Sequence, residues 1–288
     1  MVSLTLPSFL PSFEKRVPPA GVGCFFTLGI QSHNIMAKRS ARLYGTDITR
    51  ERRIMIDLWQ MERELKASGY QTICGVDEAG RGPLAGPVVA AAVILPEGLD
   101  IGVDDSKKLK EAERDALYDE IIAKAVGYGI GMASVEEIDA VNILNATYLA
   151  MNRAIEALCR GAHCAPACVN AVGTTNNAAK RLLAGEHSSP LRVPDLCLID
   201  GNLATGVTYP NLCVVKGDSK CASIAAASIL AKVTRDRLMV ELHEVYPQYG
   251  FDRHKGYPTK AHYAALDAHG VSAIHRESFL RKWREARV

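Results

Sequence analysis

The chain has 288 residues, 48% of them hydrophobic and 23% charged, which is typical of an ordinary globular protein. A formal net charge of +2 is too small to indicate nucleic-acid binding by overall charge, so any such surface must come from local clusters. No stretch has the eighteen or so consecutive apolar residues that a membrane helix needs. The eight cysteines follow no framework spacing, which favours free thiols in a reducing cytoplasm over a metal cluster of Cys159, His163, Cys164 and Cys168.

The first 46 residues differ in character from the rest of the chain. Residues 1–35 hold a single acid, Glu14, with scattered Pro and Gly, and they lack the charged start of a signal peptide. We expect residues 1–46 to be a disordered or non-native extension, and residues 47–288 to form the main domain. A packing helix is predicted from Asp47 to Gly69 by a stripe of apolar residues. The stripe consists of Ile54, Leu58, Met61 and Leu65.

Two acids stand where the first predicted strand ends. Residues 72–77 and 88–95 are apolar or rich in β-formers, and a Gly- and Pro-rich region separates them, which predicts two paired strands of a buried sheet. Asp77 is the last residue of the first strand, and Glu78 follows it directly. Two desolvated carboxylates repel each other and raise each other's pKa unless a cation neutralises them. The simplest such cation is a divalent metal ion.

Helices and strands then alternate along the chain. The pattern predicts a helix over residues 111–124, a strand over 128–133 and helices over 135–158. Residues 160–194 are rich in Ala, Asn, Thr, Ser and Gly and show no sustained period, so we expect an inserted surface loop there. Alternation of this kind is typical of an α/β fold with a mixed sheet.

Two further acids stand at the ends of later elements. Residues 196–199 form a short apolar strand that ends in Asp200, and a strand over 212–215 leads to Asp218 at the start of a long Ala-rich helix. Taken singly, Asp200 fits an ordinary turn and Asp218 an ordinary helix N-cap. Capping does not explain the adjacent pair at the first strand, however. Because open sheets place their sites outside the strand ends, the four acids together predict a metal site.

A fifth acid, Asp236, belongs to the same predicted helix as Asp218. At 1.5 Å per residue it would lie about 27 Å farther along, too far to share a metal ion. Its neighbours Arg235 and Arg237 predict a local ion-pair cluster instead.

Six stretches of this chain form a recognisable set of motifs. They are GVDEAGRGPLAGPVVA at 75–90, DSKKL at 105–109, LIDGN at 198–202, KGDSK at 216–220, AAASILAKVTRD at 225–236 and YGFDRHKGYPT at 249–259. The chain resembles in them type 2 ribonuclease H, the bacterial ribonuclease HII family, and they occur in the family's order and span about residues 70–279. The family's metal-binding catalytic acids fall on the four acids already selected, Asp77, Glu78, Asp200 and Asp218.

The resemblance implies a ribonuclease H-like fold, a mixed sheet flanked by helices with a C-terminal helical region. It implies an endonuclease that hydrolyses the RNA strand of RNA–DNA hybrids and nicks duplex DNA 5′ to an embedded ribonucleotide. Two-metal-ion hydrolysis with manganese or magnesium would leave 3′-hydroxyl and 5′-phosphate ends. We expect a monomer that acts in the cytoplasm without a membrane. The long loop at 160–194 and the extension at 1–35 depart from the family.

The resemblance also assigns substrate contacts. Gly80, Arg81 and Gly82 match the loop whose backbone contacts the 2′-hydroxyl and the adjoining phosphate, and glycines permit that close approach. Tyr257 matches the tyrosine that stacks on the following deoxyribose, although a partly buried tyrosine after a glycine turn is the simpler alternative. Lys107 is a candidate phosphate contact, against the alternative of a solvated loop lysine.

Two other functions remain open from the residues. A metal-dependent nuclease or phosphatase on the same fold would keep the acids without requiring a 2′-hydroxyl. A catalytically silent nucleic-acid-binding module would need no metal charge at four places.

Overall fold

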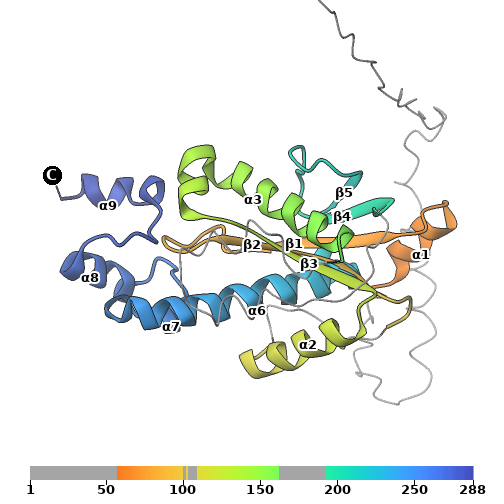
Figure 1. Ribbon diagram of the computed structural model, residues 1–288, viewed down its shortest axis with the longest axis horizontal. Coiled ribbons are helices and arrows are strands. Elements are labelled where there is room, and N and C mark those ends of the chain that lie inside the picture. Colours follow the sequence, from red (N-terminus) through yellow and green to blue (C-terminus); the bar gives the residue numbers. More distant parts are fainter. Residues whose placement is uncertain (1–56, 100–101, 103–108, 162–192, 288) are drawn as a thin grey trace, which may run out of the picture. The chain divides into compact units, whose positions relative to one another are not determined.

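The computed structural model describes residues 57–99, 102, 109–161 and 193–287. Its longer elements follow the predicted order of strands and helices (Figure 1). The strands are β1 (Ile73–Ala79), β2 (Val88–Ile94), β3 (Gly127–Ala133), β4 (Leu196–Asp200) and β5 (Asn211–Val214). The helices are α1 (Gln60–Ala67), α2 (Glu111–Lys124), α3 (Val135–Cys159), α6 (Ala222–Val245), α7 (Phe251–His254), α8 (Lys260–His269) and α9 (Arg281–Glu285).

The five strands form one mixed sheet in the order β3-β2-β1-β4-β5. The strands β1, β2 and β3 pair antiparallel, whereas β4 lies parallel to β1 and β5 parallel to β4. The predicted mixed α/β sheet is therefore confirmed. The parallel pairing of β4 with β1 places the carboxyl ends of both strands at the same edge of the sheet.

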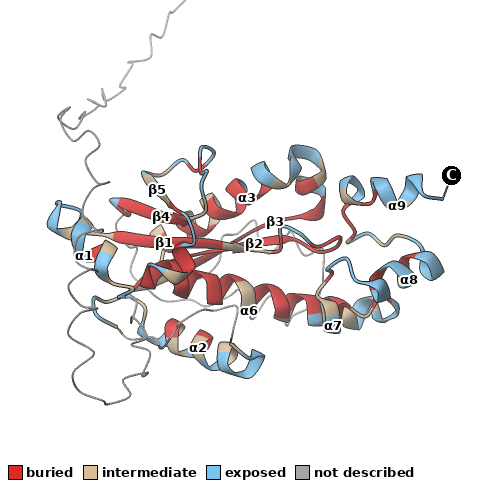
Figure 2. Cartoon of the chain, turned by 180° about the vertical axis from the view of Figure 1, so that it is seen from behind, coloured by how far each residue is buried: buried red, intermediate tan, exposed pale blue. Residues whose placement is uncertain are grey.

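Helices cover both faces of the sheet (Figure 1). On one face, Val76, Ala90 and Ile199 pack with Ile155 of α3 in one apolar cluster. On the other face, Ala91 and Val93 of β2 pack with α6 and with Tyr118 and Ile121 of α2. A sheet covered on both faces has apolar strands without alternation, which is the reason that β2 is buried along its whole length (Figure 2).

Gly75 of β1 decides how closely α6 approaches the sheet. A Cβ atom at this position would lie 2.1 Å from the backbone carbon of Ser223, so only glycine fits. The first turn of α6 therefore rests directly on β1, two residues before Asp77. This contact brings the segment that precedes α6 to the edge of the sheet where the acids lie.

The C-terminal helical region is confirmed as well. Beyond α6, the short helices α7, α8 and α9 follow one another at one end of the sheet (Figure 1). Phe251, Leu266 and Leu280 from this region pack with Leu84 and Val89 in a further apolar cluster. The region thus packs against the loop that joins β1 to β2.

Several element boundaries differ from the predicted ones. Of the helix predicted from Asp47 to Gly69, the described residues contain α1, which begins at Gln60. Within α3, Asn142 has a left-handed φ of 68°, and its side chain accepts hydrogen bonds from the N–H groups of Leu144 and Asn145, which starts the helix anew. Most of the loop predicted at 160–194 and the extension at 1–46 lie outside the described residues.

None of the helices in the described part of the chain is both long and apolar enough to cross a membrane.

Candidate active site

Asp77 and Glu78 are neighbours near the C-terminal end of β1, where successive side chains point to opposite sides of the strand. Asp77 is 6% exposed, and its Oδ1 accepts a 2.7 Å hydrogen bond from the backbone N–H of Glu78. Glu78 accepts a 3.2 Å bond from Arg81 Nη1 and forms an ion pair with it. A buried carboxylate with few donors around it is costly in the charged form.

Asp200 reaches the same edge from the neighbouring strand. Val76 of β1 is paired with Ile199 of β4, so Asp77 and Asp200 follow directly on adjacent parallel strands. Asp200 Oδ1 accepts a 2.7 Å hydrogen bond from the backbone N–H of Gly217. This bond ties the end of β4 to the segment that carries Asp218.

Asp218 lies in a 3₁₀ turn (Gly217–Ser219) that precedes α6. The sequence suggested a position at the N-cap of the long helix, and this is wrong, because α6 begins at Ala222 with Cys221 as its N-cap. Lys216 has a left-handed φ of 56°, which turns the chain sharply from β5 into the 3₁₀ turn. The turn places Asp218 against the sheet edge, where it is 7% exposed.

The four acids act on one another electrostatically. Burial raises the pKa of the Asp77 carboxyl well above its ordinary value, and the negative charges of Glu78, Asp200 and Asp218 raise that pKa further. Burial also raises the pKa of Glu78, while the Arg81 guanidinium opposes the rise. Glu78, Asp200 and Asp218 therefore all lie within electrostatic reach of Asp77, and a cation among them would relieve this repulsion.

The donor set suits a hard divalent cation by its chemistry. Carboxylate oxygens are the ligands that Mg²⁺ and Mn²⁺ prefer, and Asp77 is buried with like charges around it. As placed, no group of three or more His, Cys, Asp or Glu side chains in the described ranges is arranged so that it could hold a metal ion. The acids fit the ion by type and neighbourhood, and ligation requires side-chain adjustment, for instance release of Glu78 from Arg81.

A cleft of about 480 Å³ opens beside the acids. Seven of the nine site residues predicted from the sequence line it, and they come from β1, the following loop, β4 and the segment after α7. The seven are Asp77, Glu78, Gly80, Arg81, Gly82, Asp200 and Tyr257. Asp218 lies beside these residues without lining the cleft, and Lys107 lies outside the described residues.

The loop after β1 and Tyr257 both line this cleft and lie close together. Gly80 has a φ of +94°, which residues other than glycine rarely adopt. A Cβ atom at Gly82 would lie 3.7 Å from Cε1 of the Tyr257 ring, with nothing else nearby. The Tyr257 side chain is 41% exposed, as suits an aromatic surface that meets a ligand.

Three further polar residues line the cleft that the sequence did not single out: Arg114 of α2, and Ser228 and Lys232 of α6. The i, i+4 spacing of Ser228 and Lys232 within the stretch 225–236 was an available signal, since it puts both on one face of a helix. Nothing local marks Arg114. Lys232 Nζ binds both oxygens of Asp236 at 2.6 Å.

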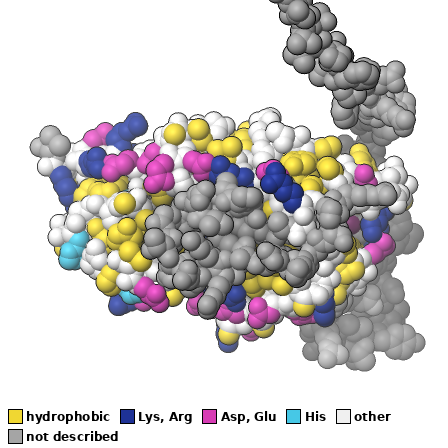
Figure 3. Space-filling model, viewed as in Figure 1, with side chains coloured by type: hydrophobic (Ala, Val, Ile, Leu, Met, Phe, Trp, Pro, Cys, Tyr) yellow, Lys and Arg dark blue, Asp and Glu magenta, His cyan; other side chains and the backbone are white. Residues whose placement is uncertain are grey.

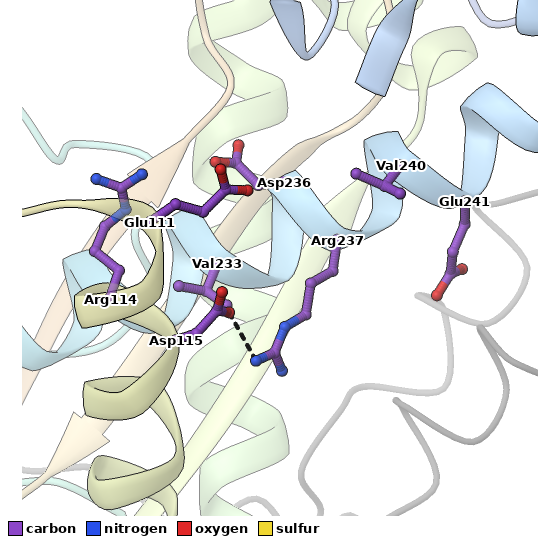
Figure 4. A pocket seen from close by; sticks show the side chains of 8 residues that line it. All are labelled: Glu111, Arg114, Asp115, Val233, Asp236, Arg237, Val240 and Glu241. Atoms are coloured by element: carbon purple, nitrogen blue, oxygen red, sulfur yellow. Dashed lines mark hydrogen bonds and ion pairs between the residues drawn. The ribbon is translucent and has the colours of Figure 1, made fainter. Parts of the chain in front are cut away.

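The ion-pair cluster predicted around Asp236 therefore has different members. Arg235 turns into the protein and donates to backbone carbonyls, whereas Arg237 pairs with Asp115 of α2 at 2.8 Å. Arg237, Asp115 and Asp236 line a second hollow of about 310 Å³ between α2 and α6 (Figure 4). Helix geometry separates the three neighbours, because consecutive residues point about 100° apart.

Charge on the visible surface is mixed. Basic and acidic side chains lie close together over α9 (Figure 3), where Arg284 pairs with Glu277. This mixture agrees with the small net charge of +2.

The family model for ribonuclease HII matches residues 74–190 and 200–282 of the chain. A ribonuclease HII of Dechloromonas aromatica (strain RCB) is 52% identical over 208 residues, which cover 72% of this chain and 90% of that protein. A ribonuclease HII of Clostridioides difficile (strain 630) is 47% identical over 221 residues, 76% of this chain and 74% of that protein.

The fold is also found among solved structures. The crystal structure of ribonuclease H2 from Pyrococcus horikoshii OT3 matches with a TM-score of 0.51 and 26% identity, covering 75% of this chain and 98% of the other. The family match spans β1 to the C-terminal helices and includes the acids at the ends of β1 and β4. The chain therefore belongs to the ribonuclease HII family, whose ribonuclease H activity on RNA–DNA hybrids makes it a hydrolase.

Proposed function

We propose that this enzyme cuts on the 5′ side of a ribonucleotide embedded in duplex DNA, in addition to hydrolysing the RNA strand of RNA–DNA hybrids, and leaves 3′-hydroxyl and 5′-phosphate ends. The observation that carries the proposal is the single cleft that brings Asp77, Glu78 and Asp200 together with Gly80, Gly82 and Tyr257. In such a cleft, one group of residues can hydrolyse a phosphodiester while another contacts the neighbouring sugar.

Asp77, Glu78, Asp200 and Asp218 would hold the divalent ions, magnesium or manganese. Bound there, the ions would activate an attacking water and stabilise the leaving oxygen of an in-line displacement. The mutual repulsion that raises the Asp77 pKa supports this role, since it costs stability unless a cation is present. The hydrogen bond from Gly217 engages one oxygen of Asp200, and the second oxygen would be offered to an ion.

The loop and Tyr257 would recognise the ribonucleotide. Glycines at positions 80 and 82 let the backbone approach the 2′-hydroxyl, the group that distinguishes RNA from DNA. The ring of Tyr257 lies opposite Gly82, where it can stack on the next sugar. Arg81 is half-exposed at the cleft and can contact the adjoining phosphate once Glu78 turns to an ion.

Lys232 and Arg114 give the cleft a basic wall. We assign them to the phosphates of the bound duplex, together with Lys107, whose position lies outside the described residues. Contacts of this kind hold the duplex in place without reading its sequence.

The test uses a labelled DNA duplex with one ribonucleotide, an all-DNA duplex and an RNA–DNA hybrid, each with Mg²⁺, Mn²⁺ or EDTA. We expect metal-dependent nicking 5′ to the ribonucleotide, cleavage of the hybrid and no cutting of the all-DNA duplex. Phosphatase treatment and extension by a polymerase identify the new ends as 5′-phosphate and 3′-hydroxyl. Cutting of every duplex would indicate a general nuclease, and cutting of the hybrid alone would contradict the single-ribonucleotide activity.

A further inference from the structure

Two arginines are buried behind the loop that carries Gly80 to Gly82. Arg235 of α6 is 1% exposed and Arg276, which follows α8, is 0% exposed. A buried guanidinium is costly unless its N–H groups find acceptors. The hydrogen bonds of both side chains go to backbone carbonyls. Burial lowers the pKa of Arg235 to about 10 and that of Arg276 to about 9, so both stay protonated at neutral pH.

Arg235 connects two separate segments of the cleft. Its Nη2 donates to the carbonyl of Ala85 at 3.1 Å and its Nε to that of Pro87 at 3.1 Å, both in the loop between β1 and β2. Its Nη1 donates to the carbonyl of Lys255 at 3.0 Å, two residues before Tyr257. Its Cζ lies 5.9 Å from the centre of the Tyr257 ring, within cation–π range.

In the described part of the chain, the hydrogen bonds of the Arg276 side chain go only to the loop between β1 and β2. Its Nη2 donates to the carbonyl of Gly80 at 2.6 Å, its Nη1 to that of Arg81 at 3.0 Å, and its Nε to that of Gly86 at 2.9 Å. Arg276 is thus a matched comparison for Arg235, since it is equally buried and bonded to the same kind of acceptor. The two differ in that only Arg235 also bonds to the segment of Tyr257.

The loop and the Tyr257 segment also contact each other directly. The N–H of Leu84 donates to the carbonyl of Gly256 at 2.8 Å. A Cβ atom at Gly80 would lie 2.0 Å from Arg235 Nε, so the loop rests directly on the guanidinium. The distance between Gly82 and the Tyr257 ring therefore depends on the contacts that join the two segments.

We propose that Arg235 is a positioning residue that fixes Tyr257 relative to the Gly80–Gly82 loop and thereby sets the selectivity for a single embedded ribonucleotide. This inference rests on the proposed function. A lone ribonucleotide offers one 2′-hydroxyl followed by a deoxyribose, so both contacts must be made at once, in fixed spacing. A hybrid offers a hydroxyl at every RNA nucleotide. A misplacement of about 1 Å can cost roughly a hundredfold in rate. Because cleavage at the lone ribonucleotide needs both contacts together, a change in the spacing of Tyr257 and the Gly80–Gly82 loop should affect it more than cleavage of the hybrid.

The test compares R235K with R276K on two substrates, a duplex with one ribonucleotide and an RNA–DNA hybrid. Lysine keeps the charge but cannot hold three carbonyls in one plane. We expect R235K to lose roughly tenfold more kcat/KM on the single ribonucleotide than on the hybrid. R276K should lose a similar factor on both. Tyr257→Ala should cost less in the R235K background than in the wild type, because Arg235 acts through Tyr257.

Equal losses on the two substrates in R235K would overturn the proposal. A wild-type enzyme that cuts the hybrid and not the single ribonucleotide would instead contradict the proposed function. If circular dichroism shows that R235K does not fold, Gly256→Ala takes its place. The added Cβ would lie 2.6 Å from the carbonyl oxygen of Ala85 and push the segments apart with Arg235 intact. Gly256→Ala must lower kcat/KM on the single ribonucleotide more than on the hybrid. An unchanged ratio of the two kcat/KM values would overturn the proposal.

Discussion

Asp200 and Gly217 are joined by a 2.7 Å hydrogen bond from the Gly217 N–H to the Asp200 carboxylate. This bond links the end of β4 to the 3₁₀ turn that holds Asp218, although the two acids are far apart in the chain. One carboxylate thus has two functions, because it carries charge at the candidate metal site and also anchors the turn that supplies the next acid.

The two functions of Asp200 can be separated by substitution. Asp200→Asn keeps an oxygen that can accept from Gly217, whereas Asp200→Ala removes it. We expect both variants to lose at least about a hundredfold in kcat, because each removes a charged ligand. Only Asp200→Ala should lose stability, by about 1 kcal/mol, which urea unfolding measures. Equal stability of the two variants would mean that the hydrogen bond does not hold the turn.

Asp77→Asn is expected to abolish cleavage and to stabilise the metal-free protein. The substitution removes a buried charge that three other acids repel, and the amide oxygen can still accept from the Glu78 N–H. The gain should be on the order of 1 kcal/mol in EDTA. It should shrink when Mg²⁺ or Mn²⁺ is added, since the wild type alone then gains from binding the ion. A loss of stability in EDTA would show that Asp77 is structural.

Tyr257→Ala should weaken cleavage at a single ribonucleotide more than cleavage of a hybrid, whereas Tyr257→Phe should retain most of the activity. The ring stacks on a sugar and its hydroxyl is not required for that contact. Tyr263 on α8 has similar exposure, 36% against 41%, and does not line the cleft, so Tyr263→Ala is the control. Steady-state kinetics on both substrates decide this, and an equal loss on both would contradict the role.

Lys232→Gln should weaken duplex binding about equally for all sequences and reduce the slope of log K against log salt by about one. The glutamine amide can still donate to Asp236, which limits structural damage. Arg237→Gln is the matched control, since Arg237 lies five residues farther along α6 and points into the hollow between α2 and α6, paired with Asp115 (Figure 4). Fluorescence anisotropy between 50 and 200 mM salt measures both slopes. An unchanged slope in Lys232→Gln would exclude a phosphate contact.

The buried pair His262 and His275 should make the folded protein less stable as the pH falls from about 6.5 to about 4. His262 Nε2 lies 3.0 Å from His275 Nε2, an arrangement with room for one hydrogen between them. Burial lowers the pKa of each ring from its ordinary 6.5 to about 4. At these two rings the unfolded chain binds more protons than the folded protein across this range, so the contribution of the pair to the free energy of unfolding declines as the pH drops. Urea unfolding at pH 7, 6 and 5 tests this.

The variant His262→Gln provides the control for that pH dependence. It removes one of the two groups, so its stability should vary less steeply with pH, even if it is lower at pH 7. An equally steep dependence in the variant would assign the effect to other groups.

Local sequence was sufficient for the two strands that carry Asp77, Glu78 and Asp200. The apolar runs at β1 and β4 and the acids at their ends were readable because burial on both faces removes alternation, and because acids next to such runs are unusual. The α/β order and the mixed sheet followed from the same patterns. The parallel pairing that puts Asp77 beside Asp200 is a long-range contact, which no local pattern specifies.

Only the tertiary structure decided which partner each polar side chain takes. Asp236 is flanked by two arginines in sequence, yet it pairs with Lys232, because Arg235 is drawn into the core by three carbonyls from distant segments. Likewise, Asp218 precedes a helix in sequence but lies in a separate 3₁₀ turn held by Asp200. Periodicity determines which residues are buried and where elements end, whereas hydrogen-bond partners depend on which segments the fold brings together.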